Sequence, residues 1–411
     1  MIPSPDILEE EVVIPAQSQK SELAEITKAV IIPFIITRLA LVAIGLITIY
    51  YILPLINPNQ PIHSNLGTLP FHQMLYQMWA HFDSGFMTGI ARKGYPVGPH
   101  ALDGMSVWAF FPLYPIAIRL LMWPMGVTGN HAVIAGIIVS NISSLVACIY
   151  LYKLTAKEFD SKTAQRAVLY MLVYPMSFYL SAVYSEGLFM ALSIGCVYHA
   201  RKHQWLRAGI LGGLAALTRP QGVFLALAIG WEYWRAHKGL WRSLRSWLNA
   251  ASIALIPLGL ALFCLYAKQK TGVFLAFIKV EENGWGRSSS NPIMVIWNAI
   301  QHPMPSNPYT WQFYSCNMII IFLFWLLFFV ILRKMPFLYA IITFVYLYMP
   351  LASGNIGSVG RLYLITFPIY MILAWWSSRG DEWRHTAIVS VCSILMGLMM
   401  AMFVIGVYTV A

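Results

Sequence analysis

The chain has 411 residues, of which 59% are hydrophobic and only 10% are charged. Soluble globular proteins carry about 25% charged residues, so this composition excludes a water-facing surface of ordinary size. The net charge of +11 comes from Lys and Arg that cluster between apolar runs. This pattern is typical of the cytoplasmic loops of membrane proteins and does not favour nucleic-acid binding.

Residues 1–27 are polar, and we predict a mobile cytoplasmic tail there. Residues 28–411 are predicted to form a single transmembrane domain. A membrane-spanning helix needs about 20 apolar residues. By this criterion the candidate spans are 30–53, 131–152, 167–181, 186–200, 207–218, 221–234, 249–267, 313–332, 336–350, 362–377 and 386–409. The predicted fold is all-α and polytopic, with about 11 transmembrane helices (between about 9 and 13).

Most Lys and Arg of the loops fall on the side of the N-terminus, which predicts a cytoplasmic N-terminus and an outer C-terminus. Two large extracytoplasmic loops follow, residues 54–130 and 268–312. The first contains Leu75, Met78, Phe82, Phe86 and Ile90 at helical spacing. Such a pattern predicts an amphipathic helix that lies in the membrane interface.

The cysteines also limit the kind of site. They lie in or beside apolar segments, and none forms a Cys-x-x-Cys pair. We therefore predict neither a disulfide framework nor a structural zinc site. The sequence also has no Gly-rich loop followed by Lys and Ser or Thr, so it does not support ATP hydrolysis.

Two carboxylates on the outer side are candidates for chemistry. Asp83 lies on the flank of the amphipathic stretch, where a buried carboxylate can act as a general base. A helix-surface Asp that faces water is the alternative. Glu186 begins a span and is a candidate second acid, metal ligand or acceptor contact. Its alternative is a helix N-terminal Glu that the helix dipole favours.

Three arginines share the outer edge, namely Arg219, Arg287 and Arg361. Arg binds phosphate bidentately and stays charged when partly buried, so the three favour a phosphate-bearing ligand. Arginines at a membrane surface also reach toward lipid headgroups, which is the alternative.

An aromatic and proline cluster follows the first loop's helix. Phe110, Phe111 and Tyr114 are candidates to shape a groove for a polyprenyl tail. The alternative is an ordinary aromatic belt at the membrane interface, which composition alone favours.

These segments together resemble the PIG-V family of mannosyltransferases, within the GT-C class of polytopic glycosyltransferases. The resemblance runs through roughly residues 30–377. The segments that carry it are Trp79 to Asp83, Ile90 to Tyr95, Ala109 to Pro115, Tyr184 to Phe189, Thr218 to Gly222, Trp285 to Arg287 and Gly360 to Pro368. The family often has Trp before the Asp, where this chain has Phe82. The late motif also departs, and reads Gly360-Arg361-Leu362-Tyr363.

The resemblance implies a GT-C-like fold and transfer of a hexose, with mannose expected, from a polyprenyl-phosphate donor to a lipid or glycan acceptor. It implies Asp83 as the general base of an inverting reaction. It also implies Arg287 or Arg361, and less so Arg219, as donor-phosphate ligands. No metal site and no required cofactor are predicted, and a divalent cation such as Mg²⁺ or Mn²⁺ is left open.

Two rival functions stay open at this point. One is a transporter or flippase of lipid-linked sugars, and the other is a noncatalytic subunit of a membrane glycosylation complex. Transporters bind substrate near the membrane midplane, whereas the polar candidates here collect at one surface. The short loops favour a prokaryotic plasma membrane over the endoplasmic reticulum membrane.

Overall fold

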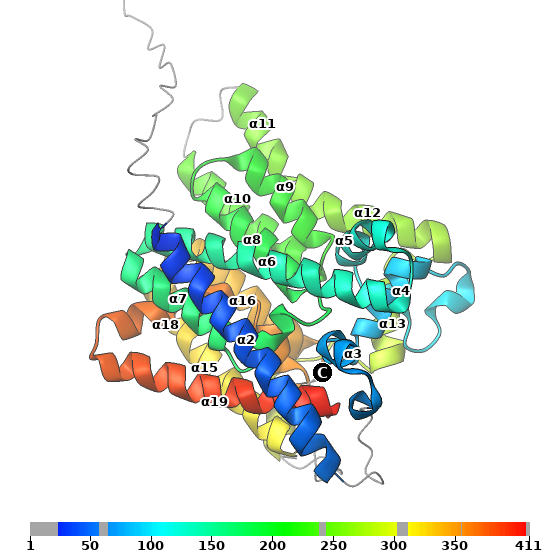
Figure 1. The fold of residues 1–411 in the computed structure, drawn as a ribbon. Helices are drawn as coiled ribbons and strands as arrows, with labels where there is room; N and C mark the ends of the chain where they lie inside the picture. Colours follow the sequence, from blue (N-terminus) through cyan, green and yellow to red (C-terminus); the bar gives the residue numbers. More distant parts are fainter. Residues whose placement is uncertain (1–23, 57–64, 238–243, 302–310, 355, 408–411) are drawn as a thin grey trace, which may run out of the picture.

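The computed structural model describes residues 24–56, 65–237, 244–301, 311–354 and 356–407, so residues 1–23 of the predicted tail lie outside it. Every regular element in these residues is helical (Figure 1), which confirms the all-α prediction. The first half contains α2 (Ile32–Ile47), α3 (Phe71–Gln77), α4 (Ser84–Lys93), α5 (Leu113–Met122), α6 (Gly129–Glu158), α7 (Ser161–Val173), α8 (Glu186–Ala200) and α9 (Trp205–Ala216). The second half contains α10 (Leu225–Ala236), α11 (Leu244–Ile253), α12 (Leu255–Thr271), α13 (Ala276–Trp285), α14 (Pro292–Gln301), α15 (Trp311–Lys334), α16 (Phe337–Ala352), α17 (Val359–Tyr363), α18 (Phe367–Ser378) and α19 (Glu382–Ile405).

Several helices are long and apolar enough to cross a membrane, as an integral membrane protein requires. Within the described residues five meet this criterion, namely Ala24–Leu55, Gly129–Glu158, Ser246–Thr271, Asn317–Lys334 and Glu382–Ile405. The other predicted spans contain shorter helices, and some are broken. The prediction for 167–181 is wrong in its second half, because α7 ends at Val173, and turns with a short 3-10 helix over Ser177–Leu180 lead on to α8. The predicted span 362–377 is likewise divided between α17 and α18.

The predicted amphipathic helix of the first loop is two helices rather than one. The chain leaves α3 after Gln77 and enters α4 at Ser84. Between them Phe82 has a φ of 54°, a left-handed conformation that cannot continue a right-handed helix. The break places Asp83 at the residue before α4, with Phe82 packed against Phe403 at 5.9 Å between ring centroids.

Small residues let neighbouring helices approach closely, as is common in membrane proteins. A Cβ atom on Gly213 of α9 would lie 2.6 Å from the carbonyl oxygen of Leu255. One on Gly259 of α12 would lie 2.2 Å from the carbonyl oxygen of Gly213. The α9–α12 pair therefore depends on glycine at both positions.

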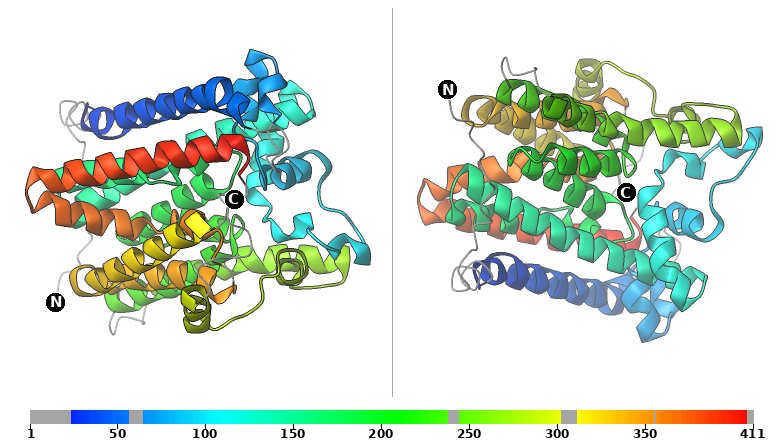
Figure 2. Two further views of the ribbon diagram at one scale, coloured as in Figure 1. Left: turned by 90° about the horizontal axis from the view of Figure 1, so that it is seen from below. Right: turned by 90° about the horizontal axis from the view of Figure 1, so that it is seen from above.

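The helices leave two distinct ends to the molecule. The loop helices α3, α4, α5 and α13 gather toward one side, while α2 and α19 run next to each other across the bundle (Figures 1 and 2). At the opposite end, Arg201 after α8 pairs with Glu158 of α6 at 2.7 Å and also with Glu232 of α10. The hydroxyl of Tyr339, at the start of α16, donates to Glu158 at 3.0 Å.

Candidate active site

A cavity of about 690 Å³ opens at the end of the bundle where the loop helices gather. Its walls come from the start of α4, the segment before α5, the turn after α9, α13, the end of α16 and α17. Six of the eight site residues singled out from the sequence line this cavity with charged or aromatic side chains. The cavity-lining members of that set are Asp83, Phe110, Phe111, Arg219, Arg287 and Arg361.

Asp83 is held by its backbone as well as by its side chain. Its N–H donates to the hydroxyl oxygen of Tyr184 at 3.2 Å. The same hydroxyl donates to the carbonyl oxygen of His81 at 3.0 Å, and Ser84 Oγ donates there too at 2.8 Å. Tyr184 therefore fixes the turn that presents Asp83, a role that sequence reasoning did not assign to it.

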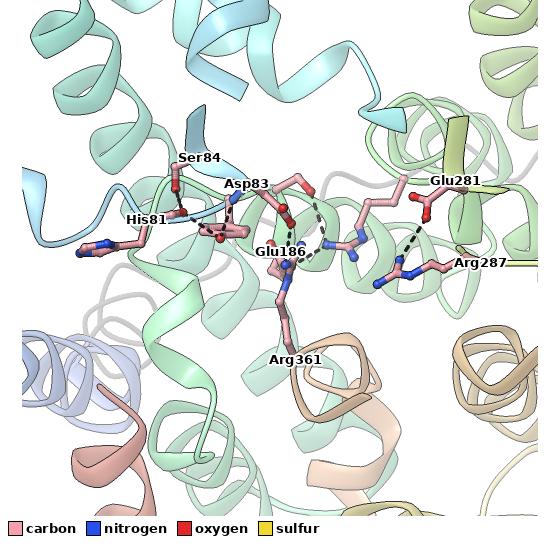
Figure 3. A network of polar contacts seen from close by, with 10 residues as sticks. His81, Asp83, Ser84, Glu186, Glu281, Arg287 and Arg361 are labelled. Atoms are coloured by element: carbon pink, nitrogen blue, oxygen red, sulfur yellow. Dashed lines mark hydrogen bonds and ion pairs between the residues drawn. The ribbon is translucent and has the colours of Figure 1, made fainter. Parts of the chain in front are cut away.

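Arg361 joins the two candidate carboxylates. Its Nη1 lies 2.7 Å from Asp83 Oδ2, and its Nε lies 2.8 Å from Glu186 Oε1 (Figure 3). Arg219 Nη1 reaches the same Glu186 oxygen at 2.8 Å. The structure thus brings together four predicted site residues from positions far apart in the chain, in the order Asp83, Arg361, Glu186 and Arg219.

The rings of two tyrosines support the guanidinium group of Arg361. Its central carbon lies 4.6 Å from the ring centroid of Tyr184 and 5.2 Å from that of Tyr179. Aromatic faces attract cations, and the attraction is stronger where water is excluded. Arg361 is therefore fixed by two carboxylates and two rings, with only 10% of its side chain exposed.

Glu186 lies behind the two arginines. Its side chain has 0% exposure and does not line the cavity, whereas 19% of the Asp83 side chain is exposed. The sequence predicted that Glu186 contacts the acceptor, but in the structure its carboxylate has no direct route to a ligand in the cavity. Its position at the first residue of α8 suits a carboxylate, because the helix dipole favours negative charge there.

Arg287 lies on another wall, apart from this cluster. Its Nη1 is 3.3 Å from Glu281 Oε2 on α13, and both side chains are partly exposed to the cavity (Figure 3). Burial raises the pKa of the Glu281 carboxyl even though the neighbouring Arg287 lowers it. Sequence reasoning missed Glu281, and its only sequence signal was a carboxylate close to Trp285-Gly286-Arg287 in a predicted outer loop.

The aromatic cluster divides in the structure. Phe110 stacks on Phe86 with ring centroids 5.0 Å apart, and it lines the cavity together with Phe111. Tyr114 is fully buried elsewhere, with its hydroxyl 2.7 Å from Ser140 Oγ and 3.1 Å from the carbonyl oxygen of Gly136. The prediction that Tyr114 lines a groove is wrong, because this side chain fastens α5 to α6.

Among the described residues, no group of three or more His, Cys, Asp or Glu side chains could hold a metal ion. What the cavity does offer is a carboxylate, Asp83, paired with Arg361, and a second guanidinium group, Arg219, joined to Arg361 through Glu186. The aromatic side chains of Phe110 and Phe111 also line its walls. Guanidinium groups form strong charge-assisted hydrogen bonds to phosphate oxygens. The carboxylate can accept a proton from a hydroxyl group brought within hydrogen-bonding distance.

Comparison with known proteins begins with a family model. The model described as "Mannosyltransferase (PIG-V)" matches residues 54–281, which is more than half of the chain. The matched region includes Asp83, Glu186 and Arg219 and ends at Glu281.

Two curated relatives carry the name GPI mannosyltransferase 2. The one from Schizosaccharomyces pombe is 30% identical over 173 residues, which are 41% of this chain and 34% of the relative. The one from Yarrowia lipolytica is 28% identical over 190 residues, 46% of this chain and 49% of the relative. The aligned part therefore spans only a third to a half of these relatives.

A solved structure shares the fold. ArnT from Cupriavidus metallidurans bound to undecaprenyl phosphate aligns with a TM-score of 0.51 at 12% sequence identity, over 78% of this chain and 61% of that one. At so low an identity the likeness concerns the arrangement of helices and not the reaction.

Proposed function

The chain belongs to the mannosyltransferase (PIG-V) family, and from this premise we propose that it transfers a hexose, expected to be mannose, from a polyprenyl-phosphate donor to a hydroxyl of a lipid or glycan acceptor. One observation carries the proposal. A cavity-facing carboxylate, Asp83, shares an ion-pair cluster with Arg361 and Arg219, so a base for the acceptor and cations for a leaving phosphate stand together.

In the proposed reaction the acceptor hydroxyl attacks the anomeric carbon and gives its proton to Asp83. The bond from that carbon to the phosphate oxygen breaks, and the polyprenyl phosphate leaves with the electron pair. The attack comes from the side opposite the leaving group, so the configuration inverts. Arg361 and Arg219 stabilise the charge that develops on the phosphate, which is the kind of electrostatic help that contributes most to many enzymes.

The other site residues receive supporting roles. Glu186 orients the two arginines through the one oxygen that both of them contact. Arg287 is a third cation for the donor, and Glu281 sets its position. Phe110 and Phe111 supply apolar surface for the first part of the polyprenyl chain. The reaction as proposed needs no metal, and turnover measured with EDTA and with added Mg²⁺ or Mn²⁺ tests that point.

The proposal also includes the membrane arrangement. About eleven helices span the bilayer, and the cavity opens on the extracytoplasmic face between the loops 54–130 and 268–312. Helices α3 and α4 lie in the interface. Both named relatives are fungal, which gives no support to the expected prokaryotic membrane, so the host membrane is not part of the proposal.

A transporter would hold its substrate near the midplane of the bundle. The placement of Asp83, Arg219 and Arg361 at one end of the helices favours a reaction at a surface instead. A noncatalytic subunit would bind the donor without turning it over, so an activity measurement separates that function from the proposed one.

The test uses purified protein, radiolabelled polyprenyl-phosphate mannose and candidate lipid acceptors. Asp83→Asn should lower the transfer rate by about 10²- to 10⁴-fold, the usual contribution of a general base. Donor binding should persist. Asp103→Asn is the matched control, because Asp103 lies in the same loop with 72% of its side chain exposed and pairs only with His100 among the contacts described. Equal transfer by wild type and Asp83→Asn would remove Asp83 from the reaction.

A further inference from the structure

One buried amide in the cavity is left without a partner. Gln221 lines the cavity with only 8% of the residue exposed, and its Oε1 is buried with no hydrogen-bond partner in the described structure. A buried polar atom without a partner destabilises the folded protein, so a ligand that satisfies it gains affinity. Sequence reasoning passed over Gln221, because the family pattern through Thr218 and Arg219 leaves its position open.

A second amide on the wall makes the contrast clear. Asn317 also lines the cavity, but its Nδ2 donates to the carbonyl oxygens of Ile356 and Gly357, each at 2.9 Å. Its Oδ1 accepts the N–H of Gly360 at 3.2 Å. The amide of Asn317 is therefore used to hold the segment that leads into Arg361, whereas the carbonyl oxygen of Gln221 is not used at all.

The backbone holds Gln221 in place. The ring of Pro220 fixes the φ angle of the residue directly before Gln221. The N–H of Gly222 donates to the carbonyl oxygen of Arg219 at 3.0 Å. Gly222 is pressed against α9, since a Cβ atom there would lie 2.4 Å from the backbone nitrogen of Ala216. A side chain carried on so rigid a turn is suited to selecting between ligands of similar shape.

The chemistry of the group indicates what it binds. An amide is neutral and offers both a donor and an acceptor, which suits hydroxyl groups. Charged phosphate oxygens are served by Arg219, two residues earlier, and by Arg361. In a sugar phosphate the ring hydroxyls are covalently held close to the phosphate, so a group beside the phosphate ligands meets the sugar ring.

We propose that Gln221 is a specificity-determining residue that hydrogen-bonds a ring hydroxyl of the donor hexose, next to the phosphate held by Arg219. The inference rests on the proposed function and adds the part of the site that recognises the sugar. Sites that hydrogen-bond a substrate hydroxyl reject analogues that lack it, because the buried protein group is then left unpaired.

The test pairs one variant with a set of donors. Gln221→Met keeps the length of the side chain and removes the amide. We measure kcat/KM for wild type and variant with polyprenyl-phosphate mannose and with its 2-, 3-, 4- and 6-deoxy analogues. With the full donor, kcat/KM of the variant should be about ten- to a hundredfold lower than that of wild type. With the one analogue that lacks the recognised hydroxyl, wild type and variant should be equal, as a double-mutant cycle requires for a direct contact.

Gln77→Met is the matched control, because Gln77 lies on α3 and donates to the exposed side chain of Asn130. The inference is overturned if Gln221→Met loses the same factor with every deoxy donor, or if it loses nothing. A variant that unfolds is recognised by its melting curve, and Gln221→Glu then replaces it in the same cycle.

Failure of the proposed function would look different. In that case wild type transfers no hexose from any of the donors. Dissociation constants of the same radiolabelled donors, measured by equilibrium binding to wild type and to Gln221→Met, then decide on Gln221 alone. The contact is supported if Gln221→Met binds the full donor more weakly than wild type but binds one deoxy donor equally well. Equal losses of affinity for every donor overturn it.

Discussion

Two carboxylates that face the cavity stand in different surroundings. Asp83 is fixed by Arg361 at 2.7 Å, and its turn is held by Tyr184. Glu281 has a longer contact of 3.3 Å to Arg287, and burial raises the pKa of its carboxyl. The first arrangement holds the carboxylate of Asp83 in a fixed position, whereas the second makes the charge of Glu281 depend on pH.

Glu281 therefore affects stability in a pH-dependent way. Because its pKa is higher in the folded protein than in the unfolded chain, the folded protein holds the proton more tightly. The free energy of unfolding then falls as the pH rises through the folded pKa. Gln carries no such proton, so the melting temperature of Glu281→Gln should rise relative to wild type as the pH goes from about 5 to about 8.

The measurement is a series of melting curves in detergent across that pH range. Glu282→Gln, which removes the exposed carboxylate next along the chain, is the control. If the melting temperatures of both variants change with pH in the same way, the pH dependence does not come from the Glu281 carboxyl. Transfer activity of Glu281→Gln should fall at every pH, because Arg287 loses the group that positions it.

Residue type and order were enough to single out Asp83, Arg219 and Arg361, which the structure places in one ion-pair cluster with Glu186. A carboxylate or an arginine at the edge of an apolar span is expensive to keep, so it is conspicuous. Tyr184 and Gln221 were not predictable in this way, because Tyr and Gln are ordinary at a membrane surface. Their importance lies in what each hydroxyl or amide faces, and only the folded chain determines that.

At the scale of the elements, apolar runs predicted where helices occur but not where they break. Hydropathy does not distinguish an apolar helix from an apolar turn, so the end of α7 at Val173 was missed. The interruption between α3 and α4 was missed for a similar reason. Spacing suggested one continuous apolar face there, and the left-handed backbone of Phe82 has no signal in composition.

The helices are also joined by a buried ion-pair network at the end away from the cavity. Arg201 has 18% of its side chain exposed, and its partners Glu158 and Glu232 have 8% and 3%. Arg201→Ala would leave buried Glu158 without a cation, and buried Glu232 with only Arg235, whose side chain is 49% exposed. It should lower the free energy of unfolding by about 3–5 kcal/mol, the usual effect of removing one partner of a buried pair.

Denaturant or thermal unfolding in detergent measures this effect, with Arg207→Ala as the control, because Arg207 is exposed on α9 and donates only to Gln204 among its described contacts. The transfer rate per folded molecule should stay near the wild-type value in Arg201→Ala. A loss of stability no larger than that of the control would show that the network contributes little.

At the scale of the whole molecule, the proposed topology puts the cavity and the Arg201 network on opposite sides of the membrane. Lys268, exposed near the cavity end of α12, and Lys202, exposed after α8, report on the two sides. In a background without native cysteines, Lys268→Cys should react with a membrane-impermeant maleimide from the outer face. Lys202→Cys should react only after permeabilisation, and labelling of both from one side would contradict this topology.

The two polar networks have one further consequence. In the part of the chain that the structure describes, no residue belongs both to the Asp83–Arg361–Glu186–Arg219 cluster and to the Arg201–Glu158–Glu232 cluster. Helices of apolar side chains separate them. Evolution can therefore substitute residues at the Arg201 end of the bundle, to suit a different lipid environment or neighbour, without touching the residues of the proposed reaction at the other end.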